Sequence, residues 1–278
     1  MTLEQPERES LAAAIDVAKL TALAEKAPVD THADYLEVRG LQVRFDDFVA
    51  VDGIDLTVLQ GDLRFLIGPN GAGKTTVIDA ITGQVPAKGS VMFGHRQLAG
   101  MKVHRIVRQG VGRTFQTASV IEELSVLQNL DLAAGAGRPR RTLLRRRRQV
   151  PESVDVALEA VGLARLRDAA AGRLAHGQKQ WLEIGMLLVQ DARLLLLDEP
   201  VAGMSQAERE ETAVLLRRLS PHRTVVVVEH DMEFMRAVAD SVTVMHAGKV
   251  LSQGSVAQIQ ADPLVQEIYL GTAAAEGH

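Results

Sequence analysis

The sequence has no cysteine among its 278 residues. This absence excludes a disulfide framework, a thiolate zinc site and a cysteine nucleophile. Long apolar runs are also missing: the longest hold four or five residues, as at 194–197 and 225–228. A bilayer crossing needs about 20 such residues, so no membrane span is expected. No stretch of basic and then apolar residues opens the chain, so we expect a cytoplasmic protein without a secretory signal.

An excess of positive charge is absent as well, because 31 Lys and Arg face 35 Asp and Glu for a net charge of −4. A nucleic-acid binder is usually basic, so nucleic acid is not expected as a partner. Seven arginines do gather at 138–148. Three interpretations stay open: a solvated face, a contact with acidic lipid headgroups or a membrane subunit, and, as a minor option, a contact with nucleic acid. Aromatic residues are scarce, at 3%, and none is interleaved there for stacking on bases.

The pattern of apolar residues predicts an α/β fold. Alternating residues at 35–45 and 50–59 indicate two strands, joined at Asp46 and Asp47 into an antiparallel hairpin. Further strands are expected at 63–67, 193–197, 224–228 and 242–246. Helical patterns dominate 117–190, and Ser125 and Gln128 have the spacing of a capping box. Strands that alternate with helices favour a parallel sheet covered on both faces.

A phosphate-binding loop is the strongest signal. Gly68-Pro69-Asn70-Gly71-Ala72-Gly73-Lys74-Thr75 matches G-x-x-x-x-G-K-[ST]. It lies between an expected strand and an expected helix at 74–81. Glycines let backbone N–H groups converge on phosphate oxygens, and the helix N-terminus adds the positive end of its dipole. Lys74 is then suited to the β- and γ-phosphates of ATP, and the Thr75 hydroxyl to Mg²⁺.

A second motif places two acids directly after the apolar run at 194–197. Ligands of open α/β sheets bind at the carboxyl ends of strands, where Asp198 and Glu199 are expected to lie. Asp198 is suited to hold Mg²⁺ through water, and Glu199 to accept a proton from an attacking water.

With these motifs in this order, residues 35–271 resemble the ATP-binding subunits of ABC transporters. Leu174-Ala175-His176-Gly177-Gln178 is similar to the signature motif, LSGGQ in its commonest form. The resemblance implies that Gln116 is the Q-loop glutamine, which reaches Mg²⁺ and faces the membrane partner. It also implies that His230 is the switch histidine, which senses the γ-phosphate, and that Phe45 stacks on adenine.

The resemblance implies a complete set of site residues. Catalysis is expected from Glu199, His230 and Lys74, and Mg²⁺ ligation from Thr75, Gln116 and Asp198. The expected ATP-binding residues are Phe45, Gly68, Pro69, Asn70, Gly71, Ala72, Gly73, Lys74, Thr75, Thr76 and Gln116, with Leu174, Ala175, His176, Gly177 and Gln178 acting on the ATP of a facing subunit.

Other interpretations stay open for some of these residues. Phe45 closes a strand and could belong to the core, with Phe48 then taking its role. Gln116 could cap a turn, and an isolated histidine such as His230 is usually structural. Trp181 is expected to pack within a helix.

Three positions depart from the family pattern. Ala175 replaces the signature serine and His176 the glycine after it, so a weakened or retuned site is expected. Ser205 stands where many relatives have the D-loop aspartate, and with Glu208 it has the spacing of a capping box.

The resemblance predicts the P-loop NTPase fold of ABC ATPases. A mainly parallel core is expected, with an N-terminal antiparallel β-subdomain and an inserted helical subdomain at about 117–176. Residues 1–34 are expected to form a flexible extension and 272–278 a tail, around an ATP-binding domain at 35–271.

Two stretches are similar to importers of branched-chain amino acids and of urea or amides, namely 198–205 (DEPVAGMS) and 260–271. Within this branch, 176–186 is similar to the first ATPase subunit of the urea importer. We therefore expect an ATPase that powers uptake of urea or short amides, peripheral on the inner face of the plasma membrane. A branched-chain amino acid importer and a lipopolysaccharide-type exporter are the alternatives.

The expected partners are two membrane permease subunits, a second and different ATP-binding subunit, and indirectly a periplasmic or lipid-anchored solute-binding protein. Two other ABC classes fit poorly. A translation factor carries two phosphate loops, and a chromosome-maintenance ATPase has a long coiled coil where this chain has 100 residues without sustained heptads.

Overall fold

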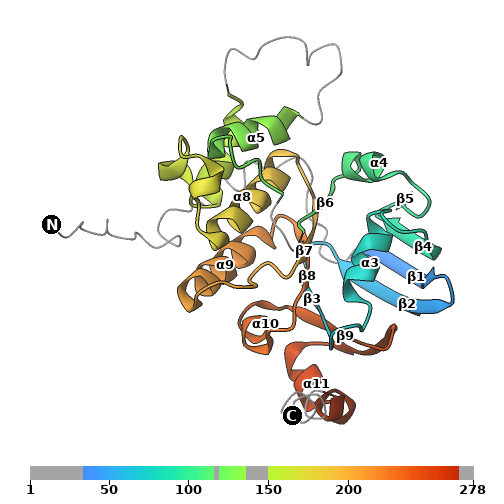
Figure 1. Cartoon of the computed structure of the whole chain (residues 1–278). Helices are drawn as coiled ribbons and strands as arrows, with labels where there is room; N and C mark the ends of the chain where they lie inside the picture. Colours follow the sequence, from blue (N-terminus) through green and yellow to red (C-terminus); the bar gives the residue numbers. More distant parts are fainter. Residues whose placement is uncertain (1–33, 116–118, 136–149, 269–278) are drawn as a thin grey trace.

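A computed structural model describes residues 34–115, 119–135 and 150–268 (Figure 1). The strands are β1 (Asp34–Phe45), β2 (Phe48–Leu59), β3 (Leu63–Ile67), β4 (Lys88–Phe93), β5 (Arg96–Gln97), β6 (Val111–Arg113), β7 (Leu194–Asp198), β8 (Thr224–Val228), β9 (Ser241–His246) and β10 (Lys249–Gly254). The α-helices are α3 (Lys74–Ile81), α4 (Val103–Arg108), α5 (Val126–Gly135), α7 (Glu152–Ala160), α8 (His176–Val189), α9 (Gln206–Leu219), α10 (Met232–Val238) and α11 (Val256–Ala261), with 3₁₀ turns η1 (Ala164–Leu166) and η2 (Ala171–Arg173). The expected extension up to residue 33, the arginine cluster 138–148 and the tail 272–278 lie outside the described residues.

A six-stranded sheet in the order β10-β9-β3-β8-β7-β6 forms the centre. Its strands from β9 to β6 are parallel, and β10 is antiparallel to β9. Every residue of β7 and β8 is buried, as expected for a parallel sheet covered on both faces. The predicted α/β fold with a mainly parallel core is confirmed.

The central sheet separates two apolar cores, because successive side chains of a strand point to opposite faces. Leu195 and Leu197 of β7 pack with residues of α8 and α9. Leu194 and Leu196 pack with residues of β1, β2 and α3 on the other face. Figure 1 shows the central strands between these two layers. The expected packing of Trp181 is confirmed: its side chain lies in the first core, and its Nε1–H donates to Thr212 Oγ1 at 2.9 Å.

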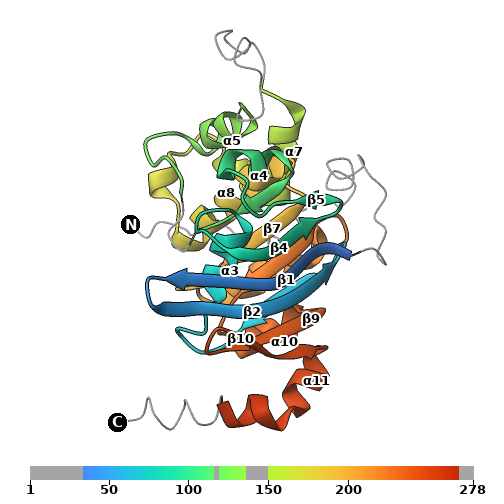
Figure 2. The ribbon, with the colours of Figure 1, turned by 90° about the vertical axis from the view of Figure 1, so that its right-hand side faces the viewer.

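The N-terminal hairpin is confirmed as part of a four-stranded antiparallel sheet in the order β2-β1-β4-β5 (Figure 2). The turn between β1 and β2 holds Asp46 at a φ of 50°, a conformation that Asp tolerates better than most residues. Strands β4 and β5 and helix α4 were not expected. In β4 the alternation is broken at Gly89, where an added Cβ would lie 2.5 Å from the carbonyl oxygen of Gly40.

Helices α5, α7 and α8 and the two 3₁₀ turns occupy most of the expected helical stretch that the structure describes. Both expected capping boxes are present. Ser125 N–H donates to Gln128 Oε1 at 2.8 Å, and Ser205 N–H to Glu208 Oε2 at 2.9 Å. None of the described helices is long and apolar enough to span a membrane.

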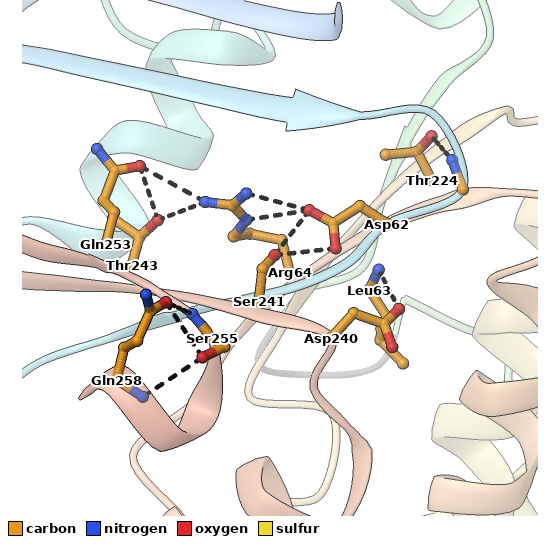
Figure 3. A network of polar contacts seen from close by, with 11 residues as sticks. Asp62, Leu63, Arg64, Thr224, Asp240, Ser241, Thr243, Gln253, Ser255 and Gln258 are labelled. Carbon is orange, nitrogen blue, oxygen red and sulfur yellow. Dashed lines mark hydrogen bonds and ion pairs between the residues drawn. The ribbon is translucent and has the colours of Figure 1, made fainter. Parts of the chain in front are cut away.

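Polar contacts join the starts of β3 and β9 (Figure 3). The Asp62 carboxylate accepts from Arg64 Nη2 at 3.1 Å and from Ser241 Oγ at 2.7 Å. Arg64 Nη1 also donates to Thr243 Oγ1 at 3.1 Å, and the side chains of Arg64 and Asp62 are 11% and 9% exposed. These charge-assisted bonds fix the register of the two strands at the edge opposite their carboxyl ends.

Candidate functional site

The carboxyl ends of β3, β8 and β7 bring three sequence segments to one edge of the central sheet. The expected phosphate loop follows β3, Glu229 and His230 follow β8, and Asp198 ends β7 and precedes Glu199. Because β3 pairs with β8 and β8 with β7 in parallel, these segments are neighbours. This edge is where open α/β sheets bind ligands.

The loop after β3 depends on glycine at two positions. Gly68 and Gly73 have φ angles of 152° and 96°. An added Cβ would lie 2.2 Å from the carbonyl oxygen of Met245 at Gly68 and 2.6 Å from that of Ala50 at Gly73. Any larger residue would collide with backbone, so the loop keeps its curvature only with glycine there.

Lys74 begins α3, and its ammonium group lies inside the curve of the loop. Its Nζ donates to the carbonyl oxygens of Gly68 at 2.7 Å and Pro69 at 3.1 Å. Burial lowers the pKa of Lys74, and the nearby carboxylates of Glu199, Asp198 and Glu229 oppose this shift. A buried ammonium facing three carboxylates is suited to bind a phosphate chain that carries its own metal ion.

Two oxygen ligands lie together beside this lysine. Thr75 Oγ1 is 3.4 Å from Asp198 Oδ1, and Asp198 is 3% exposed. No cluster of three or more metal-binding side chains occurs among the described residues. One carboxylate and one hydroxyl still fit Mg²⁺, which commonly takes few protein ligands and completes its shell with phosphates and water. Burial raises the pKa of Asp198, and the charge of Arg113 opposes this shift.

Arg113, at the end of β6, connects this site to α3. Its Nη2 lies 3.1 Å from Asp198 Oδ2, and its Nη1 pairs with Asp79 of α3. The guanidinium carbon also lies 4.9 Å from the ring centroid of Phe115. Sequence reasoning did not single out Arg113; a charged residue at the end of a short buried strand was the available signal. It supplies a cation that holds Asp198 in place.

Glu199 and His230 face each other across the ends of β7 and β8. His230 Nδ1 lies 3.8 Å from Glu199 Oε1, and the histidine side chain is 62% exposed. Glu199 has a φ of 49°, a strained conformation for a residue with a side chain. Its N–H donates to the carbonyl oxygen of Val228 at 2.9 Å, which ties it to the end of β8.

Glu229 is a second residue that sequence reasoning missed. It is 1% exposed, and its carboxylate accepts from the N–H groups of Val201 at 3.3 Å and His230 at 3.1 Å. Burial raises the pKa of Glu229. An acid directly after an apolar strand was the available signal, the same one that marked Asp198. Glu229 fixes the segment after Glu199 relative to His230.

The signature-like residues form polar contacts within α8 and with the segment after Glu199. Ala175 is the N-cap of α8, and its N–H donates to Gln178 Oε1 at 3.0 Å. His176 Nε2 lies 3.0 Å from the carbonyl oxygen of Ala202. Gly177 packs against Glu208, whose Oε1 would lie 2.8 Å from an added Cβ. The backbone N–H groups at this helix start are suited to bind an anion.

Phe45 ends β1 and is 46% exposed, so the interpretation that it belongs to the core is wrong. Phe48, the alternative aromatic, is 65% exposed. Gln116 lies outside the described residues, between Phe115 and Ser119, which the structure does describe.

The family model described as ABC transporter matches residues 51–202. A second model, described as Branched-chain amino acid ATP-binding cassette transporter, matches residues 249–275. The chain is 37% identical over 250 residues to the high-affinity branched-chain amino acid transport ATP-binding protein BraF of Pseudomonas aeruginosa, and the match covers 86% of this chain and 98% of that protein. LivG of Escherichia coli K12, which has the same description, is 35% identical with the same coverage.

Solved structures agree with these matches. The ADP conformation of MJ1267, an ATP-binding cassette of an ABC transporter, aligns with a TM-score of 0.75 at 30% identity. The alignment covers 86% of this chain and 99% of MJ1267. A bacterial Atm1-family ABC exporter aligns with a TM-score of 0.71 at 21% identity over 90% of this chain and 44% of the exporter chain, a likeness of fold alone.

The Arg113 network predicts a large effect on stability. Arg113→Met keeps an unbranched apolar stem but removes the guanidinium that pairs with both Asp198 and Asp79. We expect a loss of about 3–5 kcal/mol in the free energy of unfolding, measured by urea titration at pH 7.5. Arg217 is the matched control, because its 3.5 Å pair with Asp240 is about half exposed. Arg217→Met should lose at most about 1 kcal/mol, and equal losses in the two variants would contradict the role given to Arg113.

Proposed function

The chain belongs to the ATP-binding subunits of ABC transporters, and from this premise we propose that it powers the import of branched-chain amino acids. The family hydrolyses ATP to drive transport through membrane permeases. The observation that carries the solute class is the match to BraF and LivG, which spans 98% of both relatives. The match at 249–275 supports the same class.

The relatives favour a different solute from the one that the sequence suggested first. Urea was expected from the similarity at 176–186, with branched-chain amino acids as the alternative, and BraF and LivG support that alternative. The urea assignment is not supported by these relatives and becomes one outcome of the solute test below. The lipopolysaccharide exporter draws no support from them either.

We assign nucleotide binding to the loop after β3. The backbone N–H groups of Gly68 and of residues 70–73, together with the Lys74 ammonium, bind the β- and γ-phosphates, and the helix dipole of α3 adds to the attraction. Thr76, two residues after Lys74, completes the phosphate-binding segment. The exposed ring of Phe45 offers a face for adenine.

Magnesium is held in this proposal by Thr75, Asp198 and Gln116 together with the phosphates. When bound, it neutralises the charge that develops on the phosphates during hydrolysis. Arg113 orients the Asp198 carboxylate through Oδ2, while Thr75 contacts Oδ1.

Glu199 is the proposed general base. Its carboxylate is 20% exposed at the sheet edge, where water can reach it, and it lies beside His230. Glu199 orients the attacking water and takes its proton, while Lys74 and His230 stabilise the charge on the γ-phosphate. Glu229 holds Glu199 and His230 at a fixed distance, because its carboxylate accepts hydrogen bonds from the N–H groups of Val201 and His230.

A complete ATP site is proposed to need two cassettes. The signature residues Leu174, Ala175, His176, Gly177 and Gln178 act on the ATP of a facing subunit. Ala175 supplies no hydroxyl, and one hydrogen bond is worth about 1 kcal/mol, more with a charged acceptor. A different cassette as partner would therefore give two unequal ATP sites.

The membrane partners are proposed to contact residues 117–124. Ile121, in the described part of this segment, is 41% exposed, and Phe115 just before it is 38% exposed. Exposed apolar side chains are suited to a protein interface. The complete assembly would then hold two permeases and two cassettes at the cytoplasmic face of the membrane, and receive solute from a periplasmic or lipid-anchored binding protein.

The role of Glu199 predicts a selective loss of turnover. Glu199→Gln should bind ATP as the wild type does and lose about 10²–10⁴-fold in hydrolysis by the assembled transporter, the usual range for a general base. Lys74→Ala should instead weaken ATP binding, measured with a fluorescent ATP analogue. Glu210→Gln, an exposed change on α9, serves as the control. Wild-type hydrolysis by Glu199→Gln would disprove the assignment.

Composite sites predict assembly that depends on ATP. The isolated subunit should hydrolyse ATP slowly, because it holds two half-sites. The Glu199→Gln variant should dimerise when ATP is present, since hydrolysis no longer removes the nucleotide that joins the subunits. Sedimentation velocity with and without ATP measures this. Full activity in a strictly monomeric sample would rule out sites shared between subunits.

The solute class is tested by uptake in a deletion strain. We expect impaired uptake of labelled leucine and undiminished uptake of labelled urea. Wild-type protein should restore leucine uptake, and the Lys74→Ala variant should not, because its ATP binding is weakened. Impaired urea uptake with normal leucine uptake would instead support the urea importer.

A further inference from the structure

Helix α8 contains a buried carboxylate that the proposed chemistry does not use. Glu183 is 4% exposed, between the core residues Leu182 and Ile184. Within the part of the chain that the structure describes, it forms no ion pair. Burial raises the pKa of Glu183 to about 7, and hydrogen bonds from the N–H groups of Ser119 and Phe115 oppose this shift. No charged side chain is among the causes of the shift.

The Glu183 carboxylate connects two functional segments that are distant in sequence. Its Oε1 accepts from the N–H groups of Phe115 at 3.4 Å and Ser119 at 3.3 Å. These two residues lie on either side of the segment that contains Gln116. At the other end of the connection, α8 begins with the signature residue His176. Oε2 has no hydrogen-bond partner among the described residues.

Stability alone gives no reason for a carboxylate here. A buried charge without a cation is unfavourable, and a neutral amide accepts backbone N–H groups without that penalty. The neighbouring part of the same loop uses such an amide. Asn129 of α5 accepts from Ile121 N–H at 2.8 Å and donates to its carbonyl oxygen at 3.0 Å. The carboxylate of Glu183 thus contacts the residues that flank Gln116, whereas the neutral amide of Asn129 holds the later part of the loop at Ile121.

We propose that Glu183 is a positioning residue that couples the signature helix to the residues on either side of Gln116. A displacement of α8 would move Phe115 and Ser119 through their hydrogen bonds to this carboxylate, and a displacement of Phe115 and Ser119 would move α8 in the same way. The inference rests on the proposed function, in which the start of α8 meets the ATP of the facing subunit and residues 117–124 meet the permease.

The test uses the complete transporter in lipid vesicles, with its permeases and solute-binding protein. Three quantities are measured: ATP binding, basal ATP hydrolysis, and hydrolysis stimulated by solute-loaded binding protein. Glu183→Ala and Glu183→Gln should bind ATP within about twofold of the wild type, because the phosphate loop is unchanged. Glu183→Ala should lose about tenfold in the ratio of stimulated to basal hydrolysis, since a small misplacement of a positioning group is costly.

The pH profile distinguishes this coupling from a merely structural role. The ionised carboxylate is the stronger acceptor, so the wild-type ratio should rise as the pH passes about 7. In Glu183→Gln the ratio should stay flat between pH 6 and 8. Taking the ratio cancels any effect of pH on the hydrolysis step that is common to both rates.

Thermal unfolding provides the control for stability. A raised carboxyl pKa favours the folded state at low pH, and this contribution is lost as the pH rises through the folded-state value of about 7. Glu183→Gln should therefore have a Tm at pH 8 equal to or above that of the wild type. Trp181→Phe on the same helix is the structural control: it loses the hydrogen bond to Thr212 and should lower the Tm while keeping the pH dependence.

Two results overturn the inference, and they are distinguishable. A wild-type transporter without stimulated hydrolysis overturns the proposed function and the inference with it. If hydrolysis by the wild type is stimulated and both Glu183 variants show the same ratio of stimulated to basal hydrolysis and the same pH profile, the inference alone is overturned.

Discussion

The arrangement of the site depends on how charge is balanced at one edge of a buried sheet. Three carboxylates, Asp198, Glu199 and Glu229, lie near the Lys74 ammonium, and their charges oppose the lowering of its pKa by burial. Arg113 adds a second cation, which pairs with Asp198. Because buried charges are costly without partners, each of these groups restricts where the others can lie. The β strands bring these groups together, and the ion pairs then set the orientation of the side chains.

Much of this edge could be predicted from local patterns. The strands β3, β7 and β8 are short apolar runs, and the loop before α3 carries its own glycines, so a few adjacent residues are enough to identify each one. Arg113 and Glu183 could not be found this way. Their partners lie 85 residues away for Arg113 and Asp198, and 68 residues away for Glu183 and Phe115. Only the fold brings them together. The edge strand β10 was missed because it is largely polar and lacks a buried apolar run.

Phe45 shows how a correct strand prediction can still leave the burial of a residue open. Leu41 and Val43 of β1 are buried, and the alternation places Phe45 on the same side. It is exposed where the strand ends: Phe45 pairs with Phe48 directly beside the turn of the hairpin. The exposure therefore goes with a position at the end of the hairpin, which the periodicity of one strand does not contain.

The two candidate solutes illustrate what similarity in a buried helix can and cannot indicate. The similarity to a urea-type subunit lies at 176–186, and Trp181, Leu182 and Ile184 within it are core residues. Such residues are selected by packing against neighbouring helices, which any ABC cassette of this shape requires. A cassette meets its solute only through the permease, so information about the solute belongs to the surface that contacts the permease. The match to BraF and LivG covers nearly the whole of those proteins, that surface included, and is the better guide to what this chain helps to transport.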